Sequence, residues 1–345
     1  MQYIIRSTAS TYNKKTIALL QDNQNLVSAR YPVRLTDYYA ALIKQPHDAI
    51  WKQCMPDTRE LEDLSQCPDP LDEGVLSPVP GLIHRYPDRV VLLVSNRCAV
   101  YCRFCMRKRL VGSGDAPMGE EELRKALSYI AAHPEIHDVI LSGGDPLMLD
   151  DASLSKILTG LRAIPHVAII RIGTRIPVTF PERITPELCT LLRTFHPLYI
   201  NTHFNHPDEI TGDSATACTL LADAGIPLGN QTVLLKGVND SVEIMRSLMT
   251  GLLSLRVRPY YLHQMDLVQG TAHFRTSVRT GLEIIRGLRG HISGLAVPHY
   301  VIDLPGGKGK VAILPDDVTI RGNMLQLRTY TGEQVFYEDI TTLQE

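Results

Sequence analysis

The stretch "VVLLVSNRCAVYCRFC" (Val90–Cys105) joins a strand-like apolar run to three closely spaced cysteines. The run Val90–Ser95 is short and rich in β-branched residues, as in a parallel strand covered on both faces. Cys98, Cys102 and Cys105 follow with the spacing C-x3-C-x2-C, and thiolates suit zinc or an iron–sulfur cluster. A structural zinc ion would need a fourth cysteine or histidine from elsewhere, whereas a cubane cluster on three thiolates would leave one iron open to a small molecule. The stretch therefore predicts a metal centre directly after a strand.

The composition is that of an ordinary globular protein. Of 345 residues, 44% are hydrophobic and 21% charged, which suits one barrel-sized domain with appendages. The formal net charge of −2 gives no reason to expect a nucleic-acid or membrane partner. The N-terminus lacks the long apolar region of a signal peptide, and no apolar run of about twenty residues could span a bilayer. Seven cysteines without an export signal predict a cytoplasmic protein with reduced thiols.

A regular alternation of strand and helix patterns starts at residue 90. Short apolar runs predict strands at 90–95, 138–144, 167–173, 198–204, 230–235 and 258–263. Segments of helical period follow them at 121–133, 152–163, 186–194, 214–224, 242–253 and 281–290. This alternation predicts an α/β fold with a parallel sheet, in an open or partial barrel, and a site at the carboxyl ends of the strands. Ahead of it, 35–44 has a helical pattern and Cys67–Gly81 is a Pro-rich connector.

Two glycine-rich segments contain further candidate site residues. "LSGGDPL" (Leu141–Leu147) ends the second predicted strand, and its glycines allow a backbone to approach a ligand, although a tight turn would have the same sequence. In "VIDLPGGKGKVAI" (Val301–Ile313), the phosphate-loop pattern fails because Leu304 replaces the first glycine and Val311 replaces the Ser or Thr. A flexible surface loop and a turn that presents a lysine for Schiff-base chemistry are the remaining alternatives.

Several dense motifs in the same order make the chain resemble the lysine 2,3-aminomutases, a pyridoxal phosphate (PLP)-dependent branch of the radical S-adenosylmethionine (SAM) superfamily. The resemblance extends from Pro78 to Pro315. Besides the cysteine stretch, the matching segments are "SPVPGLIHRYPDRV", "LSGGDPL", "RIGTRIPV", "NTHFNHP", "LADAGIPLGNQTVLLKGVND", "RPYYLHQMD", "HFRT" and "DLPGGKGK". The resemblance implies a partial (β/α)6 radical SAM barrel at 81–300. A mostly helical extension at 1–80 would precede the barrel, and a segment with the PLP lysine at 301–345 would follow it.

The resemblance implies that the three cysteines hold a [4Fe-4S] cluster whose open iron chelates the amino and carboxylate groups of SAM. Gly143, Gly144 and Asp145 would lie at the methionyl group of SAM, and His203 of "NTHF" would lie at its adenosine end. Without the resemblance, His203 would be taken for a core histidine with its hydrogen bonds satisfied. Reduction of the cluster implies an electron donor such as flavodoxin or ferredoxin.

The PLP site is implied by three of the motifs. The family's Schiff-base lysine falls on Lys310, the last residue of "PGGKGK", and Lys308 is a competitor because the motif usually has glycine there. Arg85 and Arg89 of "HRYPDR" and Gln231 of "GNQ" would bind the PLP phosphate, for which the planar fork of arginine is suited. Without the family, the two arginines would be taken for a solvated pair ahead of the first strand.

The implied reaction moves the α-amino group of L-lysine to the β-carbon, so that the chain would be an isomerase. Arg107 falls where the family binds the α-carboxylate of the substrate, and Asp266 and Asp303 fall where the lysine enzymes hold the distal ammonium. Two carboxylates around one ammonium would reject a neutral or acidic side chain. Each acid alone could equally belong to a turn or a cap.

The chain also departs from the full-length lysine enzymes. It is shorter at both ends, Ser241 stands where they have a cysteine after "GVND", and no cysteine follows Cys218. Their structural zinc is therefore predicted to be absent, and a homo-oligomer is an expectation from the family alone. The alternatives are the branch that makes β-lysine for elongation factor P, a glutamate-directed aminomutase, and a non-enzymatic metal-stabilised scaffold. Cys54, Cys67, Cys189 and Cys218 are predicted to be buried apolar thiols.

Overall fold

The computed structural model describes residues 24–62, 66–112, 116–315, 317–321 and 324–338. The N-terminal residues on which the prediction about an export signal rests lie outside these ranges. Within the ranges, no helix is both long enough and apolar enough to cross a membrane.

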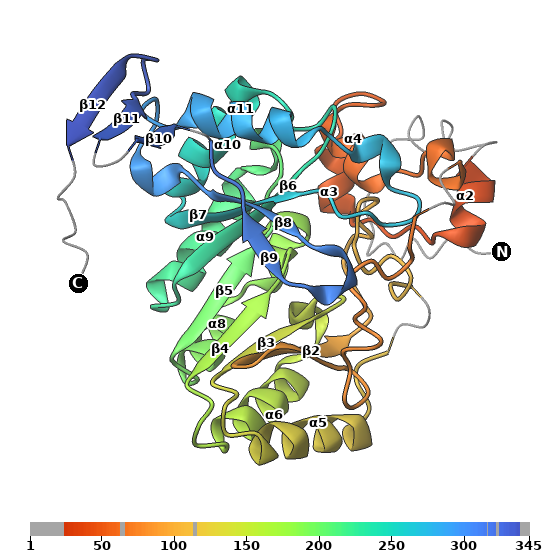
Figure 1. Cartoon of the computed structure of the whole chain (residues 1–345). Coiled ribbons are helices and arrows are strands. Elements are labelled where there is room, and N and C mark those ends of the chain that lie inside the picture. Colours follow the sequence, from red (N-terminus) through yellow and green to blue (C-terminus); the bar gives the residue numbers. More distant parts are fainter. Residues whose placement is uncertain (1–23, 63–65, 113–115, 316, 322–323, 339–345) are drawn as a thin grey trace, which may run out of the picture.

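One nine-stranded sheet forms the body of the molecule, with its strands in the order β1 to β9 (Figure 1). The strands are β1 (Leu82–Tyr86), β2 (Arg89–Ser95), β3 (Asp138–Gly143), β4 (Ile169–Gly173), β5 (Leu198–Thr202), β6 (Leu228–Leu234), β7 (Val257–Gln264), β8 (His299–Asp303) and β9 (Lys310–Ala312). Neighbours from β2 to β8 are parallel, whereas β1 and β9 pair antiparallel at the two edges. The predicted partial barrel is confirmed, and the predicted strands correspond to β2–β7.

Helices connect the parallel strands and cover one face of the sheet (Figure 1). They are α5 (Glu120–Ala132), α6 (Asp151–Arg162), α7 (Ile176–Thr179), α8 (Pro186–Arg193), α9 (Gly212–Asp223), α10 (Val242–Ser254) and α11 (Val278–Leu288). Side-chain caps define where several of them begin: the Asp150 carboxylate accepts from the backbone N–H of Ser153, and the Ser241 hydroxyl accepts from that of Ile244. Ser241, the residue that follows "GVND", thus caps the start of α10.

Along the central strands, side chains buried in the core alternate with side chains that face the site. Leu141, Ile172 and Ile200 are paired across β3, β4 and β5, and all three are fully buried on the helix-covered face. Because successive side chains point to opposite faces, Arg171 and Asn201 project to the concave face. The parallel strands therefore present polar side chains on the concave face without breaking the core.

The N-terminal segment packs on the barrel rather than standing apart from it. It contains α2 (Gln24–Arg30), α3 (Asp37–Ala41), α4 (Ala49–Cys54) and the 3-10 helix η1 (Thr58–Leu61). Tyr39, Ile50 and Trp51 belong to the same buried cluster as the strands. The division into separate parts at residues 80 and 300 stays a prediction.

A second, three-stranded antiparallel sheet lies beyond the barrel at one end of the molecule (Figure 1). It consists of β10 (Val318–Arg321), β11 (Met324–Arg328) and β12 (Gln334–Glu338). All seven cysteines are free thiols, and Cys54, Cys189 and Cys218 are buried as predicted. The same prediction is wrong for Cys67, which is exposed because it lies on the Pro-rich connector at the surface.

Candidate active site

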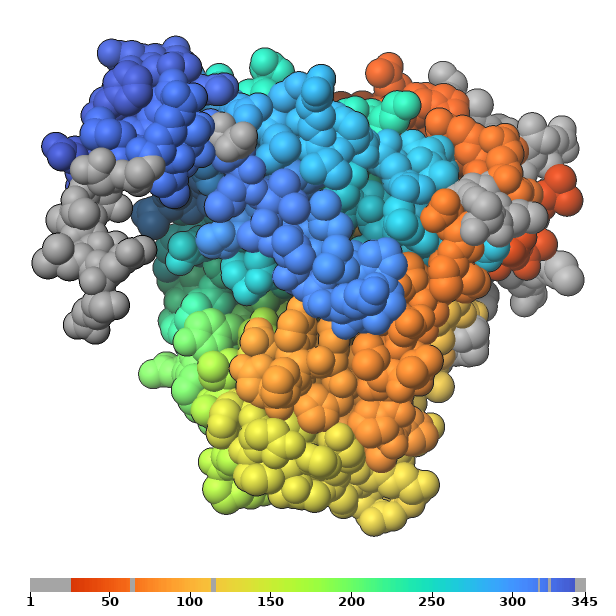
Figure 2. Space-filling model, in the orientation of Figure 1, coloured from red at the N-terminus to blue at the C-terminus, as the bar shows by residue number. Residues whose placement is uncertain are grey.

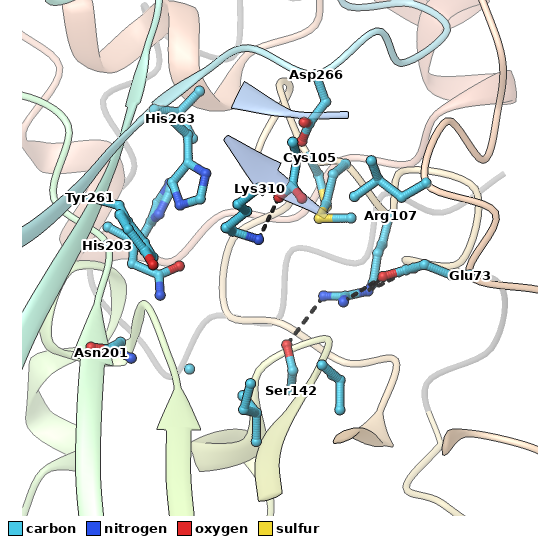
Figure 3. A pocket seen from close by; sticks show the side chains of 18 of the residues that line it. Glu73, Cys105, Arg107, Ser142, Asn201, His203, Tyr261, His263, Asp266 and Lys310 are labelled. Atoms are coloured by element: carbon cyan, nitrogen blue, oxygen red, sulfur yellow. Dashed lines mark hydrogen bonds and ion pairs between the residues drawn. The ribbon is translucent and has the colours of Figure 1, made fainter. Parts of the chain in front are cut away.

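A cavity of about 560 Å³ lies on the concave side of the sheet (Figure 3). This volume is typical of a small-molecule site. The predicted site residues that line it are Arg85, Arg89, Cys102, Cys105, Arg107, His203, Gln231, Asp266, Asp303 and Lys310. The fold thus gathers residues more than two hundred positions apart, such as Arg85 and Asp303.

Gly143, Gly144 and Asp145 form the turn after β3, and they are not among the lining residues. A Cβ on Gly144 would lie 2.4 Å from the Arg97 carbonyl oxygen, and one on Gly143 would lie 2.3 Å from that of Ser95. The glycines therefore allow the turn to pack against the backbone just before the first cysteine. Asp145 is buried, accepts a hydrogen bond from the Leu147 N–H, and has its pKa raised to about 6 by burial. The predicted contact of this turn with SAM stays a prediction.

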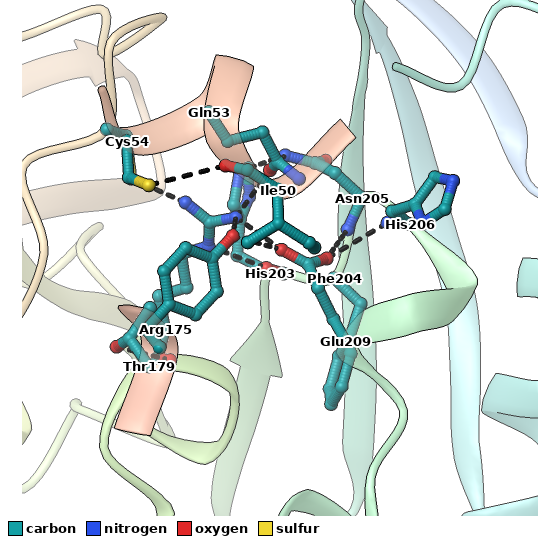
Figure 4. Close-up of polar contacts among 12 residues, drawn as sticks. Ile50, Gln53, Cys54, Arg175, Thr179, His203, Phe204, Asn205, His206 and Glu209 are labelled. Carbon is teal, nitrogen blue, oxygen red and sulfur yellow. Dashed lines mark hydrogen bonds and ion pairs between the residues drawn. The ribbon is translucent and has the colours of Figure 1, made fainter. Parts of the chain in front are cut away.

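A largely buried polar network centred on Arg175 lies behind the cysteine loop (Figure 4). The guanidinium Nη2 donates to the Glu209 carboxylate at 2.7 Å, the Gln53 amide oxygen at 2.5 Å and the Tyr39 hydroxyl at 3.1 Å. Its Nη1 donates to the Cys102 sulfur at 2.7 Å. The N-terminal helices α3 and α4 thereby position a cation against one of the predicted cluster ligands.

Lys310 enters the cavity from β9 and forms an ion pair with Asp303 at the end of β8. The Lys310 Nζ lies 2.5 Å from the Asp303 Oδ2, and Arg85 donates to the Oδ1 at 2.7 Å. Burial alone would raise the pKa of Asp303, but the Lys310 and Arg85 cations outweigh burial and hold it below its ordinary value. Lys310 lines the cavity and Lys308 does not. The geometry therefore favours Lys310 over Lys308 as the reactive amine.

Asp266 and His263 extend this wall of the cavity without partners of their own. No hydrogen bond or ion pair within the described chain involves the Asp266 side chain, and burial together with the Asp303 carboxylate raises its pKa to about 7. Burial and the Lys310 ammonium lower the pKa of His263 to about 4, so its imidazole is neutral at pH 7. The His263 Nε2 is buried, and no group in the described ranges forms a hydrogen bond with it. Such orphaned groups are expected where a ligand completes the hydrogen bonding.

Arg107 faces this wall from the loop after the last cysteine (Figure 3). Its Nε and Nη2 donate to the Glu73 carboxylate, with a shortest distance of 2.7 Å, and its Nη1 donates to the Ser142 hydroxyl at 3.2 Å. Both charged side chains are largely buried, at 14% and 4% exposure. The predicted carboxylate-binding arginine is therefore held in place before any substrate binds.

Aromatic and polar side chains form the remaining walls. The His203 ring stacks on Phe104, with ring centres 5.6 Å apart and planes 23° apart. Arg171 is paired with Asp138 at 2.7 Å, and Arg89 lies over the ring of Tyr86. A flat aromatic surface of this kind suits a planar ring. The predicted contact of His203 with the adenosine end of SAM stays a prediction.

The chain is similar to known enzymes over most of its length. A family model described as "Radical SAM superfamily" matches residues 92–248, and one described as "Lysine-2,3-aminomutase" matches residues 285–342. The L-lysine 2,3-aminomutase of Fusobacterium nucleatum is 52% identical over 309 residues, which cover 88% of this chain and 73% of that protein. The L-lysine 2,3-aminomutase of Clostridium subterminale is 49% identical over 333 residues, covering 94% and 80%. The chain belongs to the lysine 2,3-aminomutase family. The predicted family, fold class and isomerase class are therefore confirmed.

Two further similarities complete the comparison. The glutamate 2,3-aminomutase of Clostridioides difficile is 45% identical over 316 residues, which cover 91% of this chain and 75% of that protein. Among solved structures, a radical SAM methyltransferase from Sphaerobacter thermophilus has a TM-score of 0.48 and 18% identity over 64% of this chain and 68% of that chain. The aminomutase family uses a [4Fe-4S] cluster, SAM and PLP, which is the predicted cofactor set.

Cys98, Cys102 and Cys105 lie in one loop and supply three thiols, the ligand type of an iron–sulfur cluster. In the family's cluster each of the three thiolates would bind a different iron. Burial raises the pKa of Cys105 to about 11 and that of Cys98 well above its ordinary value, while Arg107 and Lys108 oppose the effect at Cys105. Bound iron would replace the thiol protons, and these cations would balance the negative charge of the cluster.

The opposite wall fits PLP. Lys310 supplies a primary amine inside the cavity, and Arg85 uses one donor on Asp303 and keeps others for a phosphate. Arg89 and Gln231 line the same cavity. The unpartnered Nε2 of His263 gives the cofactor or substrate a further hydrogen-bonding group.

Several residues that line this cavity were not predicted from the sequence. They include Glu73, Phe104, Ser142, Arg171, Asn201, Tyr261 and His263. Most of them occupy every second position of strands that were predicted only as apolar runs. Period-two alternation within those runs could have indicated Arg171, Asn201 and His263.

Proposed function

We propose that this member of the family is an L-lysine 2,3-aminomutase that converts L-lysine to β-lysine. The observation that carries the proposal is Asp266, a half-buried acid in the cavity wall that makes no hydrogen bond or ion pair with any described side chain. An ammonium group would supply the missing positive charge, whereas a distal carboxylate would add to the repulsion from Asp303. The relatives from Fusobacterium nucleatum and Clostridium subterminale are L-lysine 2,3-aminomutases by name, and that agreement supports the same substrate here.

The two predicted acids have different roles at the start of the reaction. Asp303 is held by Lys310 and Arg85, so it can receive a substrate ammonium only after Lys310 has left it. Asp266 carries no such restraint. We therefore assign the first recognition of the distal ammonium to Asp266, and we assign to Asp303 the placement of the Lys310 amine.

When bound, the cluster and SAM supply the radical that removes a hydrogen atom from the substrate, and PLP holds the amino nitrogen while it moves. The protein positions these groups. We propose that Arg107 binds the α-carboxylate and that Lys310 carries the cofactor. Arg85, Arg89 and Gln231 would bind its phosphate. The segment 143–145 and His203 would hold SAM, and the enclosing walls would keep water from the radical.

The test is anaerobic reconstitution with iron, sulfide, PLP, SAM and a strong reductant, followed by separate incubation with L-lysine, L-glutamate and L-alanine. We expect mass spectrometry to find β-lysine from L-lysine and no β-amino product from the other two. Rearrangement of L-glutamate in place of L-lysine would overturn the substrate. Cleavage of SAM without rearrangement of any free amino acid would do the same and would favour a substrate of another kind.

Three further predictions belong with this proposal. We propose that a small one-electron donor such as flavodoxin or ferredoxin reduces the cluster, and that the enzyme works in the cytoplasm. We also propose a homo-oligomer, because β10–β12 expose apolar side chains such as Ile320 and Phe336, at 69% and 66% exposure. Light scattering of the loaded enzyme would test the last point, and a purely monomeric protein would contradict it.

A further inference from the structure

Arg107 has a defined set of free donors. An arginine carries five N–H groups in a planar fork. Glu73 accepts from Nε and from one hydrogen of Nη2, and Ser142 accepts from one hydrogen of Nη1. One N–H therefore remains on each terminal nitrogen, and the described residues provide no other acceptor for either. Two donors on neighbouring nitrogens are what a carboxylate needs for a bidentate pair.

Glu73 holds the guanidinium by its side rather than by its end. The Nε atom lies 3.1 Å and 3.0 Å from the two Glu73 oxygens, and Nη2 lies 2.7 Å from Oε1. A carboxylate in this position prevents rotation about the last bonds of the arginine side chain. In Figure 3 the Glu73 carboxylate and the Ser142 hydroxyl lie on different sides of the guanidinium, which leaves its end facing the cavity.

The segment that carries Glu73 also contacts the loop that carries the reactive lysine. The Pro70 carbonyl accepts a hydrogen bond from the Gly306 N–H at 2.8 Å. Gly307, at φ +67°, packs so closely on the connector that a Cβ would lie 2.9 Å from the Leu71 carbonyl oxygen. In Figure 2 the blue C-terminal part of the barrel lies against orange surface, the colour of the sequence region that contains the connector. The connector therefore fixes Arg107 and the turn before Lys310 relative to each other.

We propose that Glu73 is a positioning residue that aims Arg107 at the α-carboxylate of the substrate. The proposal rests on the proposed function only in its use of an amino-acid substrate. A positioning role for Glu73 predicts a selective effect, which a general structural role does not. Loss of the Glu73 carboxylate should weaken the binding of substrates that have an α-carboxylate and leave the binding of α-amides largely unaffected.

The experiment compares binding of L-lysine and L-lysinamide to the PLP- and cluster-loaded protein by calorimetry, without SAM. Glu73→Gln preserves size but turns an amide N–H2 toward the arginine donors. We expect this change to weaken L-lysine binding by about tenfold or more, the effect of misaligning a charge-assisted pair, and to change L-lysinamide binding by less than about twofold. Glu73→Asp keeps the charge but shortens the reach, so it should weaken L-lysine binding by several-fold with the same selectivity.

The matched control is Asp72→Asn, which removes an equal charge one residue away. Asp72 is exposed, does not line the cavity and has φ +51°, a conformation that Asn tolerates. We expect this variant to bind both compounds as the unchanged protein does. Equal weakening of both compounds by Glu73→Gln, or unchanged L-lysine binding, would overturn the proposal.

Failure of the substrate assignment would look different. If the unchanged protein binds L-glutamate in place of L-lysine, the substrate assignment is wrong. The same comparison with L-glutamate and its α-amide then still tests Glu73, because every α-amino acid carries the carboxylate.

Discussion

One polar network lies behind the cavity wall and another lies in the wall itself, and they differ in how many of their polar groups have hydrogen-bond partners. Behind the cysteine loop, Glu209 accepts hydrogen bonds from Arg175, Tyr39 and the backbone N–H groups of Asn205 and His206 (Figure 4). Its carboxylate is fully buried and surrounded by donors. At the opposite wall, no described side chain bonds to Asp266, and the His263 Nε2 finds no hydrogen-bond partner in the described part of the chain.

The difference indicates which network stabilises the fold and which one binds a ligand. A buried network in which every group is satisfied rigidifies the fold, whereas unmatched groups are costly unless a ligand matches them. Changes in the first network should therefore act mainly on stability. Changes in the second should act mainly on binding and catalysis, and the following experiments separate the two.

The largest effect is expected at Lys310. Lys310→Ala and Lys310→Arg should both reduce β-lysine formation by at least about a thousandfold, because neither variant retains a primary amine inside the cavity. The arginine variant keeps a cation beside Asp303, so its failure would not be a matter of charge. Mass spectrometry of peptides after borohydride reduction should locate PLP on Lys310 in the unchanged enzyme.

Lys308→Ala is the matched control for the lysine prediction. Lys308 is exposed outside the cavity, so activity should stay within about twofold of the unchanged enzyme. A PLP-labelled peptide in which Lys308 carries the label would reverse the assignment.

In the satisfied network, Glu209→Gln should lower the free energy of unfolding by about 3 kcal/mol. The substitution removes the charge that balances buried Arg175 and turns an amide N–H2 toward donors. Denaturant unfolding of the loaded enzyme measures the change. Asp223→Asn breaks a surface pair with Arg256, whose side chains are 63% and 52% exposed, and should change stability by less than about 0.5 kcal/mol. Equal effects of the two variants would remove the distinction between the networks.

The sequence predicted the strands, helices and cysteine loop of this site better than the side-chain contacts around its cavity. Strand and helix periods located β2–β7, and the cysteine spacing indicated a metal centre, because both signals are local. The pairing of Arg85 with Asp303 across 218 positions depends on how the sheet closes, so only the resemblance could suggest a shared site.

Residues without a local pattern were missed for the same physical reason. Glu73 lies in a connector whose Pro-rich sequence predicts no regular structure, and its role depends on contact with Arg107. Arg175 lies within the quoted motif "RIGTRIPV", but nothing near it in sequence indicates that Cys102 and the N-terminal helices surround it. The short strands β8 and β9 were likewise not predicted from the sequence, because their position depends on pairing with other strands of the sheet.

In the unmatched network, Asp266→Asn should raise the KM for L-lysine by about 10- to 100-fold, the loss of one charge-assisted interaction with the distal ammonium. The preference for L-lysine over L-norleucine, which lacks that ammonium, should fall by a similar factor. Steady-state kinetics with both compounds measures the change, with Asp72→Asn again as the control. An unchanged KM would show that Asp303 alone recognises the ammonium.

The smallest expected effect is a pH dependence that originates from Asp266. Burial and Asp303 raise its pKa to about 7 in the free protein, against the opposing influence of Lys310, Arg85 and Arg107. Below that pH the carboxyl is neutral and cannot attract an ammonium, which stays charged because its ordinary pKa is about 10.4. The KM for L-lysine should therefore rise by about tenfold from pH 8 to pH 6, while kcat at saturation changes less because bound ammonium keeps the acid ionised.

The stability of the unliganded protein should respond to pH in the opposite direction: binding of L-lysine improves as pH rises, whereas the stability contribution of Asp266 falls. Because the folded state holds the Asp266 proton more tightly than the unfolded chain does, protonation of Asp266 stabilises the folded state at low pH. This stabilisation is lost as pH rises from about 4 through 7. Asp266→Asn should abolish both trends, and a KM profile that keeps its slope in this variant would assign the titration to another group.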